Sequence, residues 1–156
     1  MGRAMGELKP WPRTISGRRD HPVATLQHLL QARGCAVVVD GIFGPATESA
    51  LRRFQRAHGL LADGVAGPRT WRALIVTVRR GDRGDAVRAV QEEFQCRSLC
   101  GGASECGTVD GVFGPCTEEA VRRFQTAVRV DVPSVAVDGV SGPITWQALV
   151  GGMASP

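Results

Sequence analysis

Apolar residues recur every three or four positions in several stretches of the chain, which is the spacing of a buried helix face. Two long stretches carry this stripe with arginines on the opposite face, and two earlier stretches carry a shorter stripe. The pattern therefore predicts four amphipathic helices. Their stripes are Ala50, Leu51, Phe54 and Ala57; Ala120, Val121, Phe124 and Ala127; Val23, Leu26 and Leu30; and Val87, Val90 and Phe94.

An eight-residue motif, Asp-Gly-(Ile/Val)-x-Gly-Pro-x-Thr, occurs four times, beginning at Asp40, Asp63, Asp110 and Asp138. Asp-Gly supplies a turn with a positive-φ position, and proline fits the first turn of a helix, where its missing N–H leaves no bond unmade. The motif therefore predicts helix starts at Pro45, Pro68, Pro115 and Pro143.

The chain is internally duplicated. Residues 39–55 and 109–125 are identical at 13 of 17 positions, and the segments before them also align. We expect an all-α fold of two tandem three-helix bundles, copy one at residues 17–76 and copy two at 81–150. Copy two contains a Cys-rich insertion. Residues 1–16 show no periodicity and are expected to be extended or mobile.

The order of these motifs resembles the peptidoglycan-binding domain of bacterial cell-wall enzymes. The resemblance rests on a helix with LQ..L, then VDGxFGPxTxxAxRRFQ, then DGxxGPxTWxAL, and it covers both copies. It implies a small three-helix module that holds amidases, carboxypeptidases, transpeptidases or phage lysins against peptidoglycan. The expected function is thus non-catalytic recognition of peptidoglycan, through the glycan strand, the stem peptide or both.

The first motif of each copy and the helix that follows it supply the candidate ligand-binding residues, four per copy. The aspartates could instead hold backbone N–H groups, the phenylalanines could be core, and the arginines could lie on a solvated helix face. Gln27, Gln55, Gln91 and Gln125 are expected to tie loops to helices, or to contact a glycan's N-acetyl group. The candidates are Asp40, Phe43, Thr47 and Arg53, and Asp110, Phe113, Thr117 and Arg123.

Cysteine use separates the copies. Cys35, in copy one, is expected to be a buried free thiol. The other four, Cys96, Cys100, Cys106 and Cys116, lie in copy two, which favours two disulfides and an oxidising compartment. The preferred pairing joins Cys100 to Cys106 and Cys96 to Cys116, with two other pairings open. Their spacing departs from that of zinc knuckles, so no metal is expected.

Other functions find little support in the sequence. Its three histidines lie in copy one, and no HExxH, GxSxG or Cys-His signature is present, so we expect no enzyme and no cofactor. The net charge of +4 is spread along the chain, which argues against nucleic acid as a partner. No apolar run is long enough to span a membrane.

Two alternatives stay open. The chain could be a protein-interaction module that has lost glycan binding, or the targeting part of a wall hydrolase. We expect a cell-wall or extracellular location from the resemblance, although no secretory signal is visible near Met1 and a cytoplasmic location is the alternative.

Overall fold

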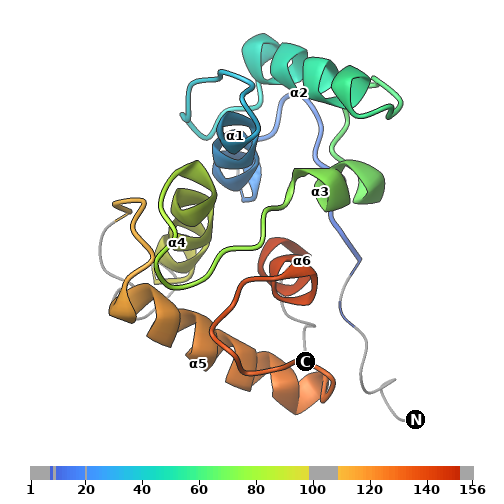
Figure 1. The fold of residues 1–156 in the computed structure, drawn as a ribbon. Coiled ribbons are helices and arrows are strands. Elements are labelled where there is room, and N and C mark those ends of the chain that lie inside the picture. Colours follow the sequence, from blue (N-terminus) through green and yellow to red (C-terminus); the bar gives the residue numbers. More distant parts are fainter. Residues whose placement is uncertain (1–7, 9, 20, 99–108, 152–156) are drawn as a thin grey trace, which may run out of the picture.

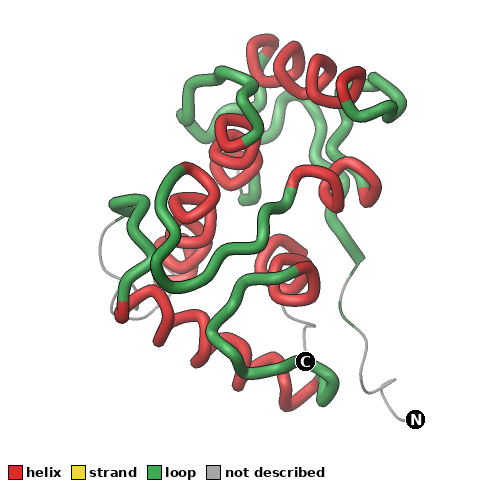
Figure 2. The backbone as a smooth tube through the Cα atoms, in the orientation of Figure 1, coloured by secondary structure: helices red, strands yellow, loops and turns green. Residues whose placement is uncertain are grey.

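The computed structural model describes residues 8, 10–19, 21–98 and 109–151. This part of the chain is all-α, with no strand, as expected (Figures 1 and 2). Each copy contributes three helices. In chain order they are α1 Val23–Ala32, α2 Pro45–Ala57, α3 Pro68–Leu74, α4 Asp85–Ser98, α5 Pro115–Asp131 and α6 Pro143–Gly151.

The four helices that follow the repeated motif begin at the prolines predicted from the sequence. In α2, α3 and α5 the residue before the proline is a glycine in extended conformation, and no side chain caps the helix. The Asp-Gly glycines have positive φ, as predicted. Gly64 has φ +72°, and a Cβ there would also lie 2.9 Å from Cγ of Glu48, so both backbone and space require glycine.

Each motif is held by a glutamine of the preceding helix. The side-chain N–H₂ of Gln27 donates to Oδ1 of Asp40 (2.9 Å), the carbonyl of Ile42 (3.0 Å) and Oγ1 of Thr47 (3.1 Å). Its Oε1 accepts the backbone N–H groups of Asp40 (3.1 Å) and Gly41 (2.9 Å). Gln55, Gln91 and Gln125 donate to the corresponding aspartate, carbonyl and threonine of the other motifs. The glutamines therefore tie loops to helices, as one of the two interpretations predicted.

The extended segments before the first helix of each copy pack in the same way. The indole N–H of Trp71 donates to the carbonyl of Pro12 (2.9 Å), and that of Trp146 donates to the carbonyl of Val76 (2.8 Å). Trp11 is buried and stacks on Trp71 with ring centroids 6.3 Å apart. The connection between the copies is therefore also the opening segment of copy two.

The two copies pack against each other through α1 and α4, which lie side by side in the middle of the molecule (Figure 1). The buried apolar side chains of both copies form one continuous cluster that includes Leu26, Phe54, Val90 and Phe124. Ala57 and Ala127 are the last residues of the two predicted stripes on the long helices. Both were expected to be buried, but both are exposed. No helix in the described ranges is long and apolar enough to cross a bilayer.

Candidate functional site

The candidate aspartates serve the turns that precede the helices. Oδ1 of Asp40 accepts the backbone N–H of Ile42 at 2.9 Å as well as the amide of Gln27. These bonds stabilise the carboxylate and hold the pKa of Asp40 below its usual 3.8, the backbone bond contributing most. Asp110 has the same arrangement with Val112 and Gln91, and its pKa is lowered for the same reasons. Both aspartates thus have the structural role that the sequence left open.

The candidate phenylalanines and threonines are buried, which corrects their prediction as ligand contacts. Phe43 and Phe113 are each 1% exposed, so neither ring can line a surface groove. Their backbone explains this placement: the N–H of Phe43 bonds the carbonyl of Arg18 (2.9 Å), and its carbonyl accepts from Gly17 (2.8 Å). This pairing draws the loop inward. Thr47 and Thr117 are also buried, with their hydroxyls bonded to Gln27 and Gln91.

The candidate arginines remain at the surface. Arg53 is exposed on α2. Arg123 is exposed on α5, where its guanidinium lies 3.0 Å from Glu119 in a solvent-exposed pair. It lines an open groove of about 570 Å³ along α5 with Pro115, Glu118, Glu119, Arg122 and Thr126. The acidic and basic side chains of this groove nearly balance, so it offers no strong preference for a charged ligand.

The cysteine predictions have mixed outcomes. Cys35 is a buried free thiol, as expected. Cys116 is a free, exposed thiol, so the predicted bond to Cys96 is wrong. Cys116 occupies the second position of α5, where the side chain points to solvent, as does Ala46 in copy one. Cys100 and Cys106 lie outside the described residues. Among the described residues no three His, Cys, Asp or Glu side chains group as metal ligands.

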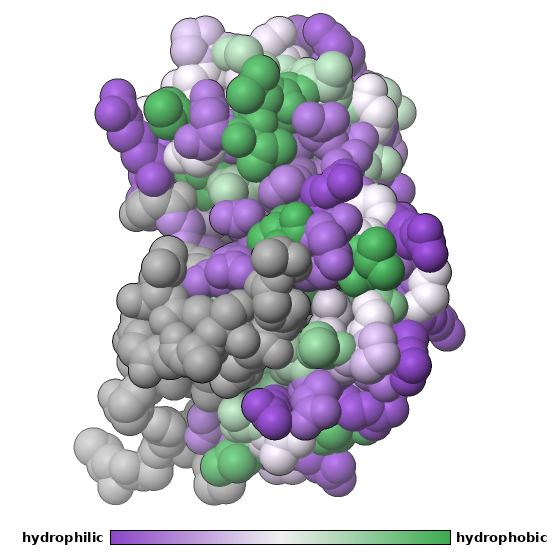
Figure 3. All heavy atoms as spheres, turned by 90° about the vertical axis from the view of Figure 1, so that its left-hand side faces the viewer, coloured by the Kyte–Doolittle hydropathy of each residue, from purple (hydrophilic) through white to green (hydrophobic). Residues whose placement is uncertain are grey.

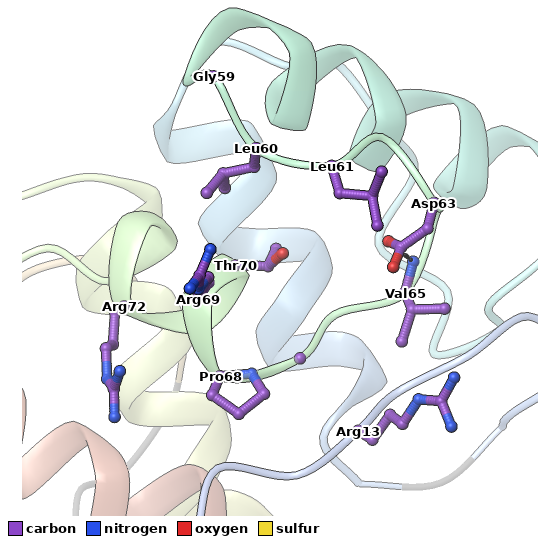
Figure 4. A pocket seen from close by; sticks show the side chains of 11 residues that line it. Arg13, Gly59, Leu60, Leu61, Asp63, Val65, Pro68, Arg69, Thr70 and Arg72 are labelled. Atoms are coloured by element: carbon purple, nitrogen blue, oxygen red, sulfur yellow. Dashed lines mark hydrogen bonds between the residues drawn. The ribbon is translucent and has the colours of Figure 1, made fainter.

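A second groove, of about 550 Å³, lies in copy one between the end of α2 and the start of α3 (Figure 4). The turn after α2 and the second Asp-Gly motif form its sides, and Arg13 reaches it from the N-terminal segment. We call it the copy-one groove. It is lined by Arg13, Gly59, Leu60, Leu61, Asp63, Val65, Gly67, Pro68, Arg69, Thr70 and Arg72.

Hydrogen bonds fix the walls of the copy-one groove. Gln55 bonds Asp63, the carbonyl of Val65 and Thr70 at 3.0–3.2 Å. Arg52, paired with Glu48 at 2.9 Å, donates to the carbonyl of Ala62 at 2.8 Å. The loop is therefore held from two turns of α2. Such preorganisation reduces the entropy lost when a ligand binds.

The lining of the copy-one groove combines apolar and basic side chains. Leu61 is 80% exposed, the most exposed of the large hydrophobic residues in the described part of the chain. Arg13, Arg69 and Arg72 are also exposed, and in Figure 4 Arg69 and Arg72 lie on one side of Pro68 and Arg13 on the other. Asp63 is the one acidic residue in the lining. On another face, drawn in Figure 3, hydrophobic residues form separate patches among hydrophilic ones.

The sequence predicts the motif at residues 63–70 as a turn and a helix start, but it does not predict that this motif lines a groove. All of the lining residues except Arg13 lie within residues 59–72, and Leu60 and Leu61 stand in a short connection that looks like an ordinary loop. One signal was available: the arginines at 69 and 72 stand where the aligned positions of copy two have Ile144 and Gln147. A difference at exposed positions of two otherwise similar copies indicates different surface chemistry.

The sequence is similar to a known family over most of its length. The profile of the family named "Putative peptidoglycan binding domain" matches residues 19–74 and again residues 83–149. The first match spans α1 to α3, and the second runs from before α4 into α6.

Curated relatives include two wall enzymes. A zinc D-Ala-D-Ala carboxypeptidase of Streptomyces albus G is 58% identical over 38 residues, which cover 24% of this chain and 15% of the enzyme. The N-acetylmuramoyl-L-alanine amidase CwlM of Mycobacterium tuberculosis is 46% identical over 77 residues, covering 49% of this chain and 19% of the enzyme. The chain thus matches less than a fifth of either enzyme.

Solved structures with local similarity include a peptidoglycan-binding protein from Clostridioides difficile, 36% identical with a TM-score of 0.40, covering 40% of each chain. A Burkholderia AP3 phage endolysin is 39% identical with a TM-score of 0.41, covering 54% of this chain and 33% of its own. Because the family profile matches more than half of the sequence, in two places, the chain belongs to the peptidoglycan-binding domain family and carries two copies of that domain in tandem.

Proposed function

We propose that this protein binds bacterial peptidoglycan at the cell wall without cleaving it, and that the copy-one groove is a principal contact site. The family assignment supports peptidoglycan as the ligand, because both domains that cover the chain belong to the peptidoglycan-binding domain family. The lining supports the location. Peptidoglycan presents lactyl and acetyl methyl groups beside charged peptide ends, and the lining of the groove includes both exposed Leu61 and three arginines.

The observation that carries this proposal is the preorganised groove next to the second Asp-Gly motif. It is open to solvent, and Gln55 and Arg52 hold its loop in place. Leu61, exposed to solvent in the free protein, would gain apolar contact when a ligand covers it. The site proposed from the sequence, with Arg53 and Arg123 on the long helices, is secondary in this account.

Two domains on one chain suit a polymeric ligand. Peptidoglycan repeats the same chemical unit, so a chain that is bound through one copy holds the other copy at a high effective concentration. Two weak contacts can then retain the protein at the wall. A targeting role for a wall hydrolase, the second sequence-based alternative, would use the same binding.

Cosedimentation with purified sacculi tests the proposal. The Leu61→Asp variant introduces a carboxylate into the groove, and we expect a smaller bound fraction than for the unaltered protein. The matched control is Val130→Asp, at a residue of α5 that is 73% exposed and outside both grooves. Equal binding by the two variants would remove the copy-one groove from the site.

Incubation of the same sacculi with the protein tests the non-catalytic part of the proposal. We expect no new reducing ends and no new free amino groups in the supernatant. Release of either group, at a rate that rises with protein concentration, would show that the chain cleaves its ligand.

A further inference from the structure

The two copies present different charges at equivalent positions beside the second Asp-Gly motif. The equivalence is structural. Thr14 pairs with Ala66 as Val78 pairs with Ser141, and the indoles of Trp71 and Trp146 bond matching carbonyls. In this register every arginine of the copy-one groove has an uncharged counterpart in copy two: Thr77 for Arg13, Ile144 for Arg69 and Gln147 for Arg72.

The arginines of the copy-one groove are not paired with a carboxylate of the groove. Arg13, Arg69 and Arg72 are exposed, and no ion pair joins any of them to a carboxylate in the described ranges. The carboxylate of Asp63 accepts from Gln55 (3.2 Å) and from the backbone N–H of Val65 (3.0 Å). Three guanidinium groups therefore remain available to a ligand.

We infer that copy one recognises an anionic group of the wall, the carboxylates of the peptidoglycan stem peptide, and that copy two contacts the wall without recognising that charge. The inference rests on the proposed function and adds a division of labour between the copies. Guanidinium groups suit carboxylates because two parallel N–H donors match the two oxygens. Leu60, Leu61 and Val65 offer apolar contact to the rest of the peptide.

A triple variant tests the inference in the full chain. In Arg13→Gln/Arg69→Gln/Arg72→Gln the groove keeps its shape and loses its charge. We expect about tenfold weaker binding to sacculi at low salt, the effect of three exposed charge contacts. The control is Arg56→Gln/Arg83→Gln/Arg129→Gln, which removes the same charge from exposed residues outside both grooves. Equal weakening in the control would attribute the loss to net charge and overturn the inference.

Sacculi whose carboxylates have been converted to amides supply the second arm. Amidation should weaken binding of the unaltered protein about tenfold and leave binding of the groove triple variant unchanged. If the groove variant also loses binding on amidation, a site elsewhere, including copy two, reads the carboxylates and the inference is wrong. If the unaltered protein binds neither untreated nor amidated sacculi, the proposed function itself fails.

Discussion

The imidazole of His21, just before α1, lies 2.7 Å and 2.9 Å from the two carboxylate oxygens of Glu93 on α4. The hydroxyl of Thr25 donates to the same carboxylate at 2.5 Å, and Glu93 is fully buried. His21 and Thr25 belong to copy one and Glu93 to copy two. This buried carboxylate of copy two is therefore bonded by two residues of copy one, where α1 packs against α4. Each copy should be less stable without the other.

Removing this carboxylate should destabilise the whole chain. We expect Glu93→Ala to lower the free energy of unfolding by about 2–3 kcal/mol, because His21 and Thr25 lose their shared acceptor in a buried place. Urea denaturation should show a single transition in the unaltered protein. Glu119→Ala is the control, since Glu119 is exposed in its pair with Arg123 and should change stability by less than about 0.5 kcal/mol. Two separate transitions in the unaltered protein would show that the copies unfold independently.

The glutamine that holds each motif should contribute strongly to stability, because its side chain satisfies several backbone groups of the turn at once. Gln27→Ala leaves the N–H groups of Asp40 and Gly41 without their acceptor, and we expect a loss of about 3 kcal/mol in the free energy of unfolding. Gln31→Ala, in the same helix, removes one bond to the carbonyl of Val37 and should cost about 1 kcal/mol. Equal losses in chemical denaturation would refute the central role of Gln27.

Phe43 should respond to substitution as a core residue. Phe43→Ala is expected to cost about 3–5 kcal/mol in unfolding free energy through the cavity it leaves. Phe43→Leu should cost less than about 1.5 kcal/mol, and this variant should bind sacculi as well as the unaltered protein does. Impaired sacculus binding by a folded Phe43→Leu variant would return this ring to the binding site.

His28 should make stability fall in mild acid. Burial lowers its pKa from 6.5, although Glu92 at 3.7 Å and Asp85 oppose this shift and Arg88 adds to it. Below pH 6.5 the unfolded chain therefore binds more protons at this residue, and the free energy of unfolding falls as the pH drops through 6.5 toward the lowered pKa. Denaturation midpoints at pH 7.5 and 5.0 should differ less in His28→Gln. The same pH dependence in both proteins would contradict this role.

Local chemistry explains what could be predicted from the sequence. The starts of α2, α3, α5 and α6 follow from Gly-Pro, which acts within a few residues, and the buried stripes follow from helical periodicity. The sequence offered two interpretations of the glutamines, and their role in tying loops to helices is confirmed. In each copy, the glutamine of the preceding helix bonds the threonine of the motif in the same way.

The features that could not be predicted from the sequence depend on contacts between segments far apart in the chain. Glu93 stands among charged and polar residues and looks like a surface position, yet its partner His21 lies 72 residues away in the other copy. The copy-one groove likewise needs Arg13 to meet α3, which no local pattern encodes. Phe43 was ambiguous for a similar reason, since its burial depends on backbone bonds to Gly17 and Arg18.

Mapping the binding site by NMR tests the central claim most directly. The uniformly ¹⁵N-labelled chain, at 16.6 kDa, is titrated with soluble disaccharide-peptide fragments of peptidoglycan while amide and arginine side-chain resonances are followed. We predict saturable shifts at Leu61, Val65, Arg69 and Arg72, with the resonances of α5 around Arg123 little changed. No saturable shifts, or shifts confined to α5, would contradict the account.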